Sequence, residues 1–382
     1  MKVLIYIIFF LNGFLINAEG KDPYLIHSFN KINSPVLAIS YSLDGLNLLA
    51  GYNDGSGRMI RITDEDYTTT FTGHWKGIQA IEMAATGKFI MTAGDNTIKI
   101  WSADGKEINT FNDHTTTIWS ADIDSTGRYI VAGAFNKTFK LIDAVAGGKA
   151  EDMRGHADIV MAVCFDHGGT KIASASGSGE IWIWDFATRK VIMKLNGQTE
   201  DIYCLDFSPD GTLLASGSKD KTIRIFDLRK GKLLSILKGH SGYVVDVDFS
   251  HNGLHLLSSS FDQTVRLWEI PTGKTLYTFI DHKDAVLDLA FSPDGKTFAT
   301  ASNDKTIKIW KYSPEIFVDF YYGNQVRSEI EGKPEFMPRQ KNEPKADFEV
   351  RQAKSGIIKD EIYTRFYDQY IDDLKKGTLP AF

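Results

Sequence analysis

The chain is poor in several residue types whose abundance would define a protein class. Of its 382 residues only two are cysteine, Cys164 and Cys204, so at most one disulfide can form, and ten are proline. The formal net charge is −6 at pH 7, which excludes the basic footprint of a typical nucleic-acid-binding protein. Glycine is plentiful, with 33 residues, and 12% of the chain is aromatic; both indicate an all-β protein with tight turns.

Long apolar runs are also scarce, and the clearest one lies at the N-terminus. Lys2 gives a positive start, residues 3–16 are almost wholly apolar, and Ala18 ends the run with a small residue. We therefore expect a signal peptide over 1–18 with cleavage after Ala18; the alternative is a short buried helix or strand. The run is too short to span a bilayer comfortably. No cysteine follows it to carry a lipid anchor, so we expect a secreted or periplasmic chain without membrane insertion after cleavage.

A dipeptide that usually ends in histidine recurs along the chain. Its copies are Gly73-His74, Asp113-His114, Gly155-His156, Gly197-Gln198, Gly239-His240 and Asp281-His282, so the interval between them is almost constant. Each copy is followed, at a fixed place in the interval, by the end of a strand-like run, at Trp101, Ile142, Trp184, Phe226, Trp268 and Trp310. A period of roughly 40 residues with four short strands per unit indicates a β-propeller.

The strands of seven blades can be assigned from this period. In the sixth, residues 244–249, 256–260, 264–268 and 276–279 alternate or cluster as strands between turn sequences. A weaker copy of the right length spans 36–62. Residues 24–29 match the outer strand of blade six, and no fourth strand follows Trp310. We therefore predict an all-β, seven-bladed β-propeller whose N-terminal strand completes blade seven and closes the ring.

These repeats resemble the WD40 family, and the resemblance covers roughly residues 22–313. In that family a His, a Ser or Thr, an Asp and a Trp of one blade form a hydrogen-bonded chain. The resemblance implies two full tetrads, His240, Ser258, Asp262 and Trp268 in blade six and His282, Thr300, Asp304 and Trp310 in blade seven. Blade two comes close with His74, Thr92, Asp95 and Trp101, while blades three to five keep only part of the set.

Catalytic interpretations of these residues are weaker than structural ones. A Ser–His–Asp trio could act in hydrolysis, but here it recurs at matching positions of several blades, which favours buried structural groups. Five of the nine histidines hold the repeat position, and a turn separates His251 from His255. We expect no catalytic residues, no metal ligands and no cofactor; a metal at the central channel is the alternative. Cys164 and Cys204 should be buried free thiols, because they lie on matching faces of neighbouring blades, about 10 Å apart.

The family's usual contact surface carries the histidine loops and the aspartate turns. By register, residues three and five places after each histidine position, and the residue before each aspartate turn, should reach this face. The implied partner-binding set is Trp119, Phe135, Ile159, Met161, Tyr203, Lys219, Tyr243 and Phe261, with Asn303 as a further polar member. Such aromatic and apolar groups suit a protein partner, although several could instead line a narrow channel rim.

Trp182 departs from the pattern at another repeat position. Two residues before the blade-closing residue, the other full repeats carry a cation: Lys99, Lys140, Arg224, Arg266 and Lys308. A position that holds cations should face solvent. We therefore expect Trp182 to be exposed, or to be covered by another element such as the C-terminal segment; the alternative is simple surface drift.

The composition changes after Ser313, and half of the ten prolines lie from Pro314 onward. We assign 314–344 as a connecting segment and linker, in which 316–322 forms a strand or docking segment. A small α-helical extension over 345–382 should contain a helix from near Asp347 to Gly377, which a break around Gly356 could interrupt. Its apolar stripe should dock on the propeller, or else on another protein, and consists of Ile358, Ile362, Phe366, Tyr370 and Leu374.

These features together predict an exported, monomeric propeller scaffold that mediates protein–protein interaction and is not an enzyme. No nucleophile, acid–base pair or metal set stands apart from the repeat pattern. The alternative is a propeller enzyme of the lactonase or hydrolase type, with a metal or an acid–base group at the central channel.

Overall fold

The computed structural model describes residues 22–64, 66–147, 149–331, 333–338 and 343–380, so the predicted signal peptide lies outside the described residues. The chain divides into two compact units, one up to Lys311 and one from Tyr312 onward. In the described ranges no helix has both the length and the apolar character needed to cross a membrane.

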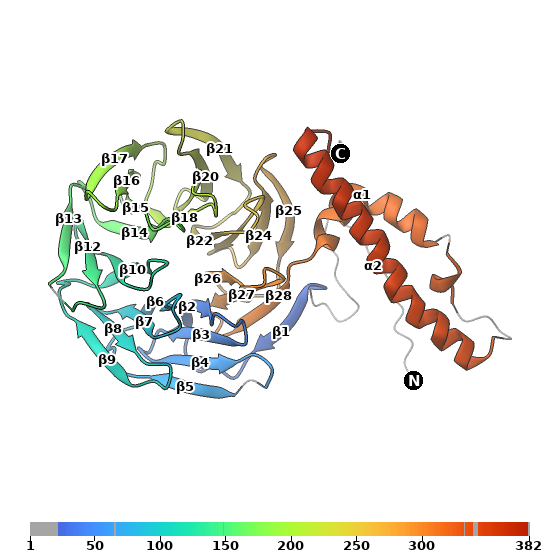
Figure 1. Cartoon of the computed structure of the whole chain (residues 1–382), viewed down its shortest axis with the longest axis horizontal. Helices are drawn as coiled ribbons and strands as arrows, with labels where there is room; N and C mark the ends of the chain where they lie inside the picture. Colours follow the sequence, from blue (N-terminus) through green and yellow to red (C-terminus); the bar gives the residue numbers. More distant parts are fainter. Residues whose placement is uncertain (1–21, 65, 148, 332, 339–342, 381–382) are drawn as a thin grey trace. The chain divides into compact units, whose positions relative to one another are not determined.

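The first unit is a ring of seven four-stranded antiparallel sheets, which confirms the predicted propeller (Figure 1). Each blade runs from an inner strand at the centre of the ring to an outer strand at its circumference. Blades one to three contain β2 (Val36–Tyr41), β3 (Asn47–Tyr52), β4 (Gly57–Arg61) and β5 (Tyr67–Phe71); β6 (Ile78–Met83), β7 (Ile90–Gly94), β8 (Thr97–Trp101) and β9 (Glu107–Phe111); and β10 (Ile118–Ile123), β11 (Tyr129–Ala134), β12 (Thr138–Asp143) and β13 (Glu151–Arg154). Blades four and five contain β14 (Val160–Phe165), β15 (Lys171–Ser176), β16 (Ile181–Asp185) and β17 (Lys190–Leu195); and β18 (Ile202–Phe207), β19 (Leu213–Ser218), β20 (Thr222–Asp227) and β21 (Lys232–Lys238). Blades six and seven contain β22 (Val244–Phe249), β23 (His255–Ser260), β24 (Val265–Glu269) and β25 (Lys274–Phe279); and β26 (Val286–Phe291), β27 (Thr297–Ser302), β28 (Ile307–Lys311) and β1 (Leu25–Phe29).

The N-terminal strand closes the ring, as predicted. β1 pairs antiparallel with β28, with Leu25 opposite Trp310 and Phe29 opposite Ile307. The amide of Lys311 donates to the carbonyl of Tyr24 at 2.7 Å, which extends the ladder by one step. Strands from the two ends of the propeller sequence therefore share one sheet, and non-covalent bonds hold the circle closed.

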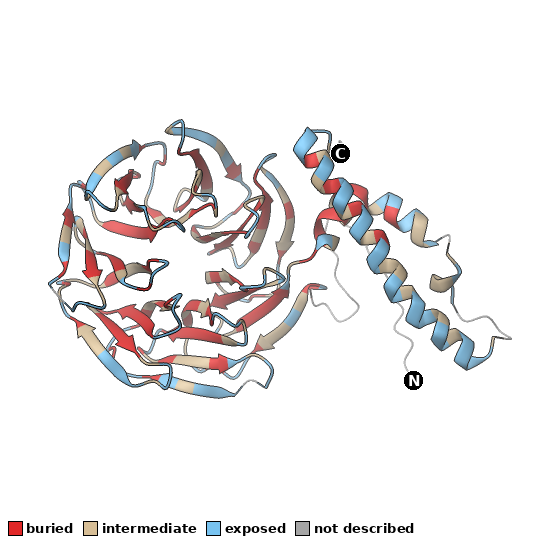
Figure 2. Cartoon of the chain, viewed as in Figure 1, coloured by how far each residue is buried: buried red, intermediate tan, exposed pale blue. Residues whose placement is uncertain are grey.

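The core of the propeller lies between neighbouring blades. The two middle strands of each sheet are covered on both faces, so most of their residues are buried, whereas most residues of the outer strands are exposed or half-buried (Figure 2). Between blades one and seven, for example, Val36, Leu48 and Ile60 pack with Ala299 and Ile309. Each blade thus depends on both of its neighbours for burial of its apolar side chains.

Every inner strand contains an irregularity that positions the candidate site. In all seven blades the pairing between the inner and second strands shifts after the first residue of the inner strand. An extra residue of this kind is unpaired, and a bulge turns its side chain away from the regular pleat. The residues at the shift are Leu37, Gln79, Trp119, Met161, Tyr203, Val245 and Leu287, and all except Met161 line the central cavity.

The second unit contains α1 (Pro314–Glu331), a short 3-10 helix η1 (Pro334–Phe336) and α2 (Lys345–Lys376). Residues 316–322 are therefore helical, and the predicted strand or docking segment is wrong. Their aromatic and β-branched side chains favour strands locally. However, Phe317 and Tyr321 are one helical turn apart, and both stack on Tyr370 of α2, with ring centroids 5.6 and 5.7 Å away. Tertiary packing therefore outweighs the local preference.

The helix α2 is unbroken at Gly356, which is exposed there, and ends before Gly377, whose left-handed conformation (φ 68°) caps it. Its predicted stripe is buried from Ile362 to Leu374. The stripe packs on α1, where the Tyr322 hydroxyl donates to Asp373 at 2.5 Å and the Tyr363 hydroxyl to Asp319 at 2.7 Å. Within its own unit the stripe thus has a partner helix, and its docking on the propeller stays a prediction.

Candidate protein-binding site

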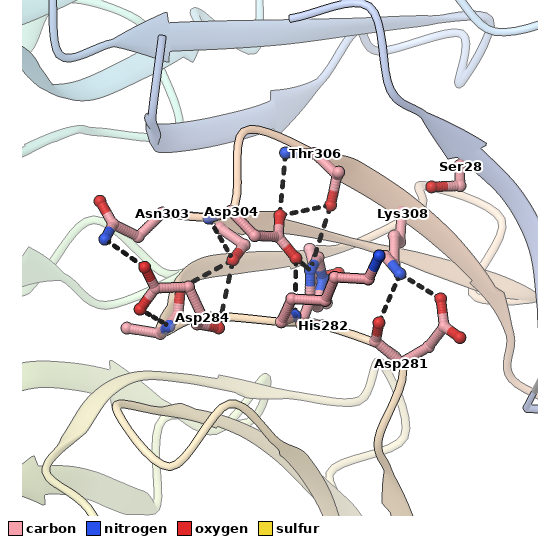
Figure 3. A network of polar contacts seen from close by, with 12 residues as sticks. Ser28, Asp281, His282, Asp284, Asn303, Asp304, Thr306 and Lys308 are labelled. Carbon is pink, nitrogen blue, oxygen red and sulfur yellow. Dashed lines mark hydrogen bonds and ion pairs between the residues drawn. The ribbon is translucent and has the colours of Figure 1, made fainter.

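The histidine loops of blades six and seven are fixed by complete hydrogen-bonded tetrads. His240 Nε2 lies 2.7 Å from Ser258 Oγ, which also accepts from the Trp268 indole at 2.8 Å. His240 Nδ1 is 2.8 Å from Asp262. In blade seven the corresponding distances are 2.7 Å from His282 to Thr300, 2.9 Å from Trp310 to Thr300, and 2.9 Å from His282 to Asp304. Figure 3 shows His282 and Asp304 side by side, with Thr306 completing the turn.

These tetrads are structural rather than catalytic. The hydroxyls of Ser258 and Thr300 are fully buried and already accept a hydrogen bond from an indole, so no substrate atom can reach them. Burial lowers the pKa of His240, against the opposing effect of Asp262, which favours the neutral ring. Burial tends to raise the pKa of Asp262, but the hydrogen bond and charge of His240 hold it well below its usual range. The carboxylate therefore stays ionised and orients the ring.

The tetrad loses members around the rest of the ring. Blade two retains it, with His74 2.8 Å from Thr92 and 3.3 Å from Asp95. In blade four His156 keeps Ser174 at 2.7 Å, but its Nδ1 has no partner among the described residues. In blade three Ala132 and Ile142 replace the hydroxyl and the indole, and neither ring nitrogen of His114 is paired within the described ranges. Burial lowers the pKa of His114 to about 4, so this ring is neutral.

Five of the predicted binding residues form a continuous aromatic arc across blades three, five and six. The ring centroids are 5.3 Å apart for Phe135 and Trp119, 6.5 Å for Trp119 and Tyr203, 6.1 Å for Tyr203 and Tyr243, and 5.6 Å for Tyr243 and Phe261. Phe135, Tyr243 and Phe261 are exposed, and Phe261 is 50% exposed. Trp119 and Tyr203 are half-buried at the bulges of β10 and β18. The structure thus joins residues that are far apart in the sequence into one surface.

The remaining predicted binding residues are less suited to contact. Met161 is buried, and it is the one bulge residue that does not line the central cavity, which contradicts its assignment to an exposed surface. Ile159 and Lys219 are half-buried. Lys219 Nζ lies 3.4 Å from Asp201, which leaves its charge partly neutralised. Asn303 is exposed and donates to Asp284 at 2.7 Å (Figure 3).

Sequence reasoning missed Trp75, which is 66% exposed in the histidine loop of blade two. Its amide donates to Asp95 at 3.0 Å, and Lys76 lies 4.6 Å above the ring. Trp75 immediately follows His74, whereas in the histidine loops we considered only residues three and five places after each histidine. Because His74 fixes the backbone of this loop, the adjacent Trp75 side chain points toward solvent.

Trp182 is buried, which fits the expected cover and not the expected exposure. The Trp182 ring stacks on His156 with centroids 4.4 Å apart, and Lys194 of β17 lies 3.7 Å above it. The cover therefore comes from blade four itself. The underlying assumption was wrong as well, because the cations Lys99, Arg224 and Lys308 at this position are also buried. They pair within their own blades, for example Lys99 with Glu107 at 2.9 Å.

A second feature that sequence reasoning missed is a set of carboxylates in the central cavity, whose volume is about 730 Å³. Each accepts a hydrogen bond from a backbone amide of the next blade's inner strand. The pairs are Glu82 with Ile123, Asp122 with Phe165, Asp206 with Phe249, Asp246 with Leu289, Asp248 with Phe291 and Asp288 with Ile39, at 2.6 to 3.3 Å. These acidic residues occupy the polar positions of inner strands in which polar and apolar residues alternate. We had interpreted that alternation as ordinary strand periodicity.

The cavity carboxyls also interact with each other. Glu82 is hydrogen-bonded to Asp122, and Asp246 to Asp288, which requires one proton per pair. Burial raises the pKa of all six groups; for Asp122 and Asp248 the pKa rises to about 6 and about 7. In blade four, Cys164 occupies the position that Asp122 and Asp248 hold in their blades. Both Cys164 and Cys204 are buried free thiols, as predicted, and burial raises their pKa.

The described ranges contain no group of three or more His, Cys, Asp and Glu side chains placed to hold a metal ion. Each cavity carboxylate instead accepts a hydrogen bond from the inner strand of the neighbouring blade. The aromatic arc lies at this cavity, because Trp119, Tyr203 and Phe261 line it together with the carboxyls.

Comparison with known proteins places these features in a family. The WD40 model, described as WD domain, G-beta repeat, matches residues 65–102, 105–143, 149–185, 189–227, 231–269 and 273–311. The chain is 28% identical over 143 residues to human transducin beta-like protein 2, covering 34% of this chain and 32% of that protein. The mouse protein of the same name is 28% identical over 151 residues, covering 35% and 34% of the two chains. Periodic tryptophan protein 2 of Saccharomyces cerevisiae is 25% identical over 189 residues, covering 46% of this chain and 16% of that protein.

Proposed function

The chain belongs to the WD40 repeat family, and from that premise we propose that its propeller is a non-catalytic scaffold that binds a protein partner through the aromatic arc. The arc consists of Phe135, Trp119, Tyr203, Tyr243 and Phe261. The matches to the curated relatives span at most about a third of those proteins' length, so the partner is argued from this chain's own surface.

One observation carries the proposal: five aromatic rings from three blades are in mutual contact, and three of them are exposed. Aromatic side chains dominate binding energy because they bury a large area with few rotatable bonds. Trp119 and Tyr203 lie at strand bulges, and the tetrad of blade six holds the turn next to Phe261, so little entropy is lost when a partner binds. The edge of the arc at Phe261 lies one residue before Asp262, which anchors blade six.

The decisive experiment removes the exposed end of the arc. Crosslinking followed by mass spectrometry in the native host identifies the partner, and binding is then measured with purified chains. Tyr243→Ala with Phe261→Ala should weaken binding by at least about tenfold, because hot-spot truncations cost more than roughly 1 kcal/mol. Thermal unfolding should change little, because both side chains are exposed.

A matched control is Ile108→Ala with Ile192→Ala, which removes two exposed side chains from outer strands. This double variant should bind like the wild type. Equal binding by the arc variant and the wild type would place the contact elsewhere, and a large loss of stability in the arc variant would assign Tyr243 and Phe261 to packing.

The absence of catalysis is part of this proposal. The alternative enzyme would need a metal or an acid–base pair at the channel, and the cavity carboxylates are the groups that could supply it. Their six hydrogen bonds to neighbouring inner strands support a structural role instead. Metal analysis of the purified protein distinguishes the two, since one tightly bound divalent ion per chain would favour the enzyme.

We also propose that the scaffold acts outside the cytoplasm, after removal of residues 1–18. The support is the order of Lys2, the apolar run and Ala18 in the sequence. Residue 22 already belongs to the propeller, since the Asp22 carboxylate accepts from the Tyr24 amide at 2.9 Å and from the Tyr277 hydroxyl at 3.3 Å. N-terminal sequencing of the protein from its host should begin at Glu19; a mature chain that starts at Met1 would reject export by this signal.

A further inference from the structure

The outer strand of blade five, β21, carries exposed aliphatic side chains on the face where β9, β13 and β25 carry polar ones. Directly opposed residues of paired strands point to the same face. Here Leu233 lies opposite Phe226, and Ile236 lies opposite Arg224. Both aliphatic side chains are exposed, and so is Leu234 at the bulge between them, at 54%.

In blades two and three the outer strand supplies the hydrogen-bond partners of the cation at this position. Lys99 is bonded to Glu107 and Thr110 of β9, at 2.9 and 3.1 Å. Lys140 meets Asp152 of β13 at 2.5 Å. In blade five Arg224 instead finds Asp220 and Thr222 in its own turn, at 2.7 and 2.8 Å. Leu233 and Ile236 therefore do not bind the cation, whereas Glu107 and Thr110 do so at the same positions of β9.

Cations surround these apolar side chains. Residues 229–238 contain Arg229, Lys230, Lys232 and Lys238 and no acidic residue, in a chain whose net charge is −6. Arg229 and Lys230 lie 3.8 and 3.4 Å from Asp227. Within the part of the chain that the structure describes, Lys232 and Lys238 form no ion pair. This strand therefore presents three aliphatic side chains between these two lysines, and its positive charge is opposite in sign to the net charge of the whole chain.

The arrangement disfavours self-association through this strand. If two copies paired their β21 strands antiparallel about Ser235, Lys232 of each would face Lys238 of the other. Like charges directly opposite each other destabilise a strand pair, and lysines at an edge are a common protection against such pairing. The same two lysines would attract a partner that carries carboxylates at both ends of an apolar core.

We propose that β21 docks an extended segment of a partner protein with an apolar centre and acidic flanks. β21 is the last strand of its sheet, so its outward backbone groups can pair with such a segment while Leu233, Leu234 and Ile236 contact the apolar centre. This surface is separate from the aromatic arc, and its occupation needs no contact with the channel mouth.

The test uses the full chain and two fluorescently labelled, capped peptides. Both have leucine and valine alternating with threonine at the centre; one carries two glutamates at each end and the other two lysines. The glutamate peptide should bind, and the lysine peptide should bind at least about tenfold more weakly. Leu233→Thr with Ile236→Thr should reduce glutamate-peptide binding by about tenfold or more, while threonine preserves strand preference and therefore the fold.

Charge reversal and matched controls complete the design. Lys232→Glu with Lys238→Glu should invert the preference between the two peptides. Ile192→Thr, at the corresponding bulge of β17, and Tyr243→Ala with Phe261→Ala, in the arc, should leave peptide binding unchanged. Circular dichroism melting of each variant separates lost binding from lost folding.

Several outcomes would overturn the proposal. Equal binding of the two peptides, or unchanged binding by the threonine variant, would show that β21 is no docking strand for acidic segments. Sedimentation in which wild type self-associates and the threonine variant does not would assign the patch to a second copy. Binding to phosphatidylserine vesicles that the charge reversal abolishes, without peptide binding, would assign it to a membrane surface.

Discussion

Blade six and blade three occupy equivalent places in the ring but are held together differently. In blade six His240 links Ser258, Asp262 and, through the shared hydroxyl, Trp268. In blade three His114 is as deeply buried, yet neither of its ring nitrogens is paired within the described ranges. Burial in apolar packing is therefore enough to keep a blade in the ring, and the tetrad adds stability to a fold that packing already determines.

The two blades nevertheless share the bonds that cross from one blade to the next. Asp122 of blade three and Asp248 of blade six hold the same position relative to their histidines, and each accepts from the next inner strand, at 2.6 and 2.9 Å. In blade three the link to the next blade is thus kept although the links within the blade are lost.

The largest effect should come from the indole of blade six. Trp268→Ala removes a fully buried side chain that packs between blades and donates to Ser258. We expect a loss of about 3–5 kcal/mol in the free energy of unfolding, measured by denaturant titration. A loss below about 1 kcal/mol would mean that blade six, like blade three, does not depend on its indole.

The shared hydroxyl should come next. Ser258→Ala creates in blade six the alanine that blade three has at Ala132, and leaves His240 Nε2 without its donor and the Trp268 indole without its acceptor. Each buried group left unpaired costs roughly 1–3 kcal/mol, so we expect a loss of about 2–3 kcal/mol by the same titration. An unchanged midpoint would show that the tetrad contributes nothing beyond packing.

The shared carboxylates should give a pH effect of similar form in both blades. A carboxyl whose pKa is raised on folding stabilises the fold below its unfolded value of about 3.9, and this stability is lost as pH rises through the folded value. The folded values are about 6 for Asp122 and about 7 for Asp248. Asp122→Asn and Asp248→Asn keep an acceptor but cannot ionise. Relative to wild type, each variant should therefore become steadily more stable as the pH rises from roughly 4 to the folded pKa of the carboxyl that it replaces.

Unfolding measured across that pH range checks this expectation, with the subtraction of wild type removing the opposing contribution of the buried histidines. A constant difference between variant and wild type would contradict the raised pKa of these two carboxyls. A slope in blade six alone would show that the two blades differ at their junctions as well as in their interiors.

The smallest effect should come from repairing blade three. Ala132→Ser places a hydroxyl at the position relative to His114 that Ser258 holds relative to His240, where it can donate to or accept from the His114 ring. We expect a gain of about 0.5–1.5 kcal/mol, the usual net value of one hydrogen bond. Destabilisation instead would mean that the interior of blade three has adapted to the absence of this hydroxyl.

The sequence was sufficient for the features that repeat. The spacing of His240 and Trp268, the turn residues, and the match of residues 24–29 to an outer strand led to seven blades closed by β1. The buried cysteines followed from register, because strand periodicity determines which face each occupies. These inferences succeed because each repeat is one supersecondary unit whose pattern is sampled several times.

Features that depend on the closure of the ring were not accessible in this way. The side chains at the bulges, such as Trp119 and Tyr203, come together only when the inner strands converge. The channel carboxylates looked like the solvent side of ordinary strands, since nothing local shows that the inner strands of other blades face them. The helix α1 was missed for a related reason: its aromatic residues favour a strand until α2 packs against them.

The pairing of β1 with β28 has a consequence for biosynthesis. The first strand to leave the ribosome cannot find its partner until the rest of the propeller sequence has been made, since Leu25 pairs with Trp310. This high contact order makes ring completion a late and slow step. Until then Leu25, Ile26 and Phe29 lack their strand partner, and chaperones that hold emerging chains should bind them.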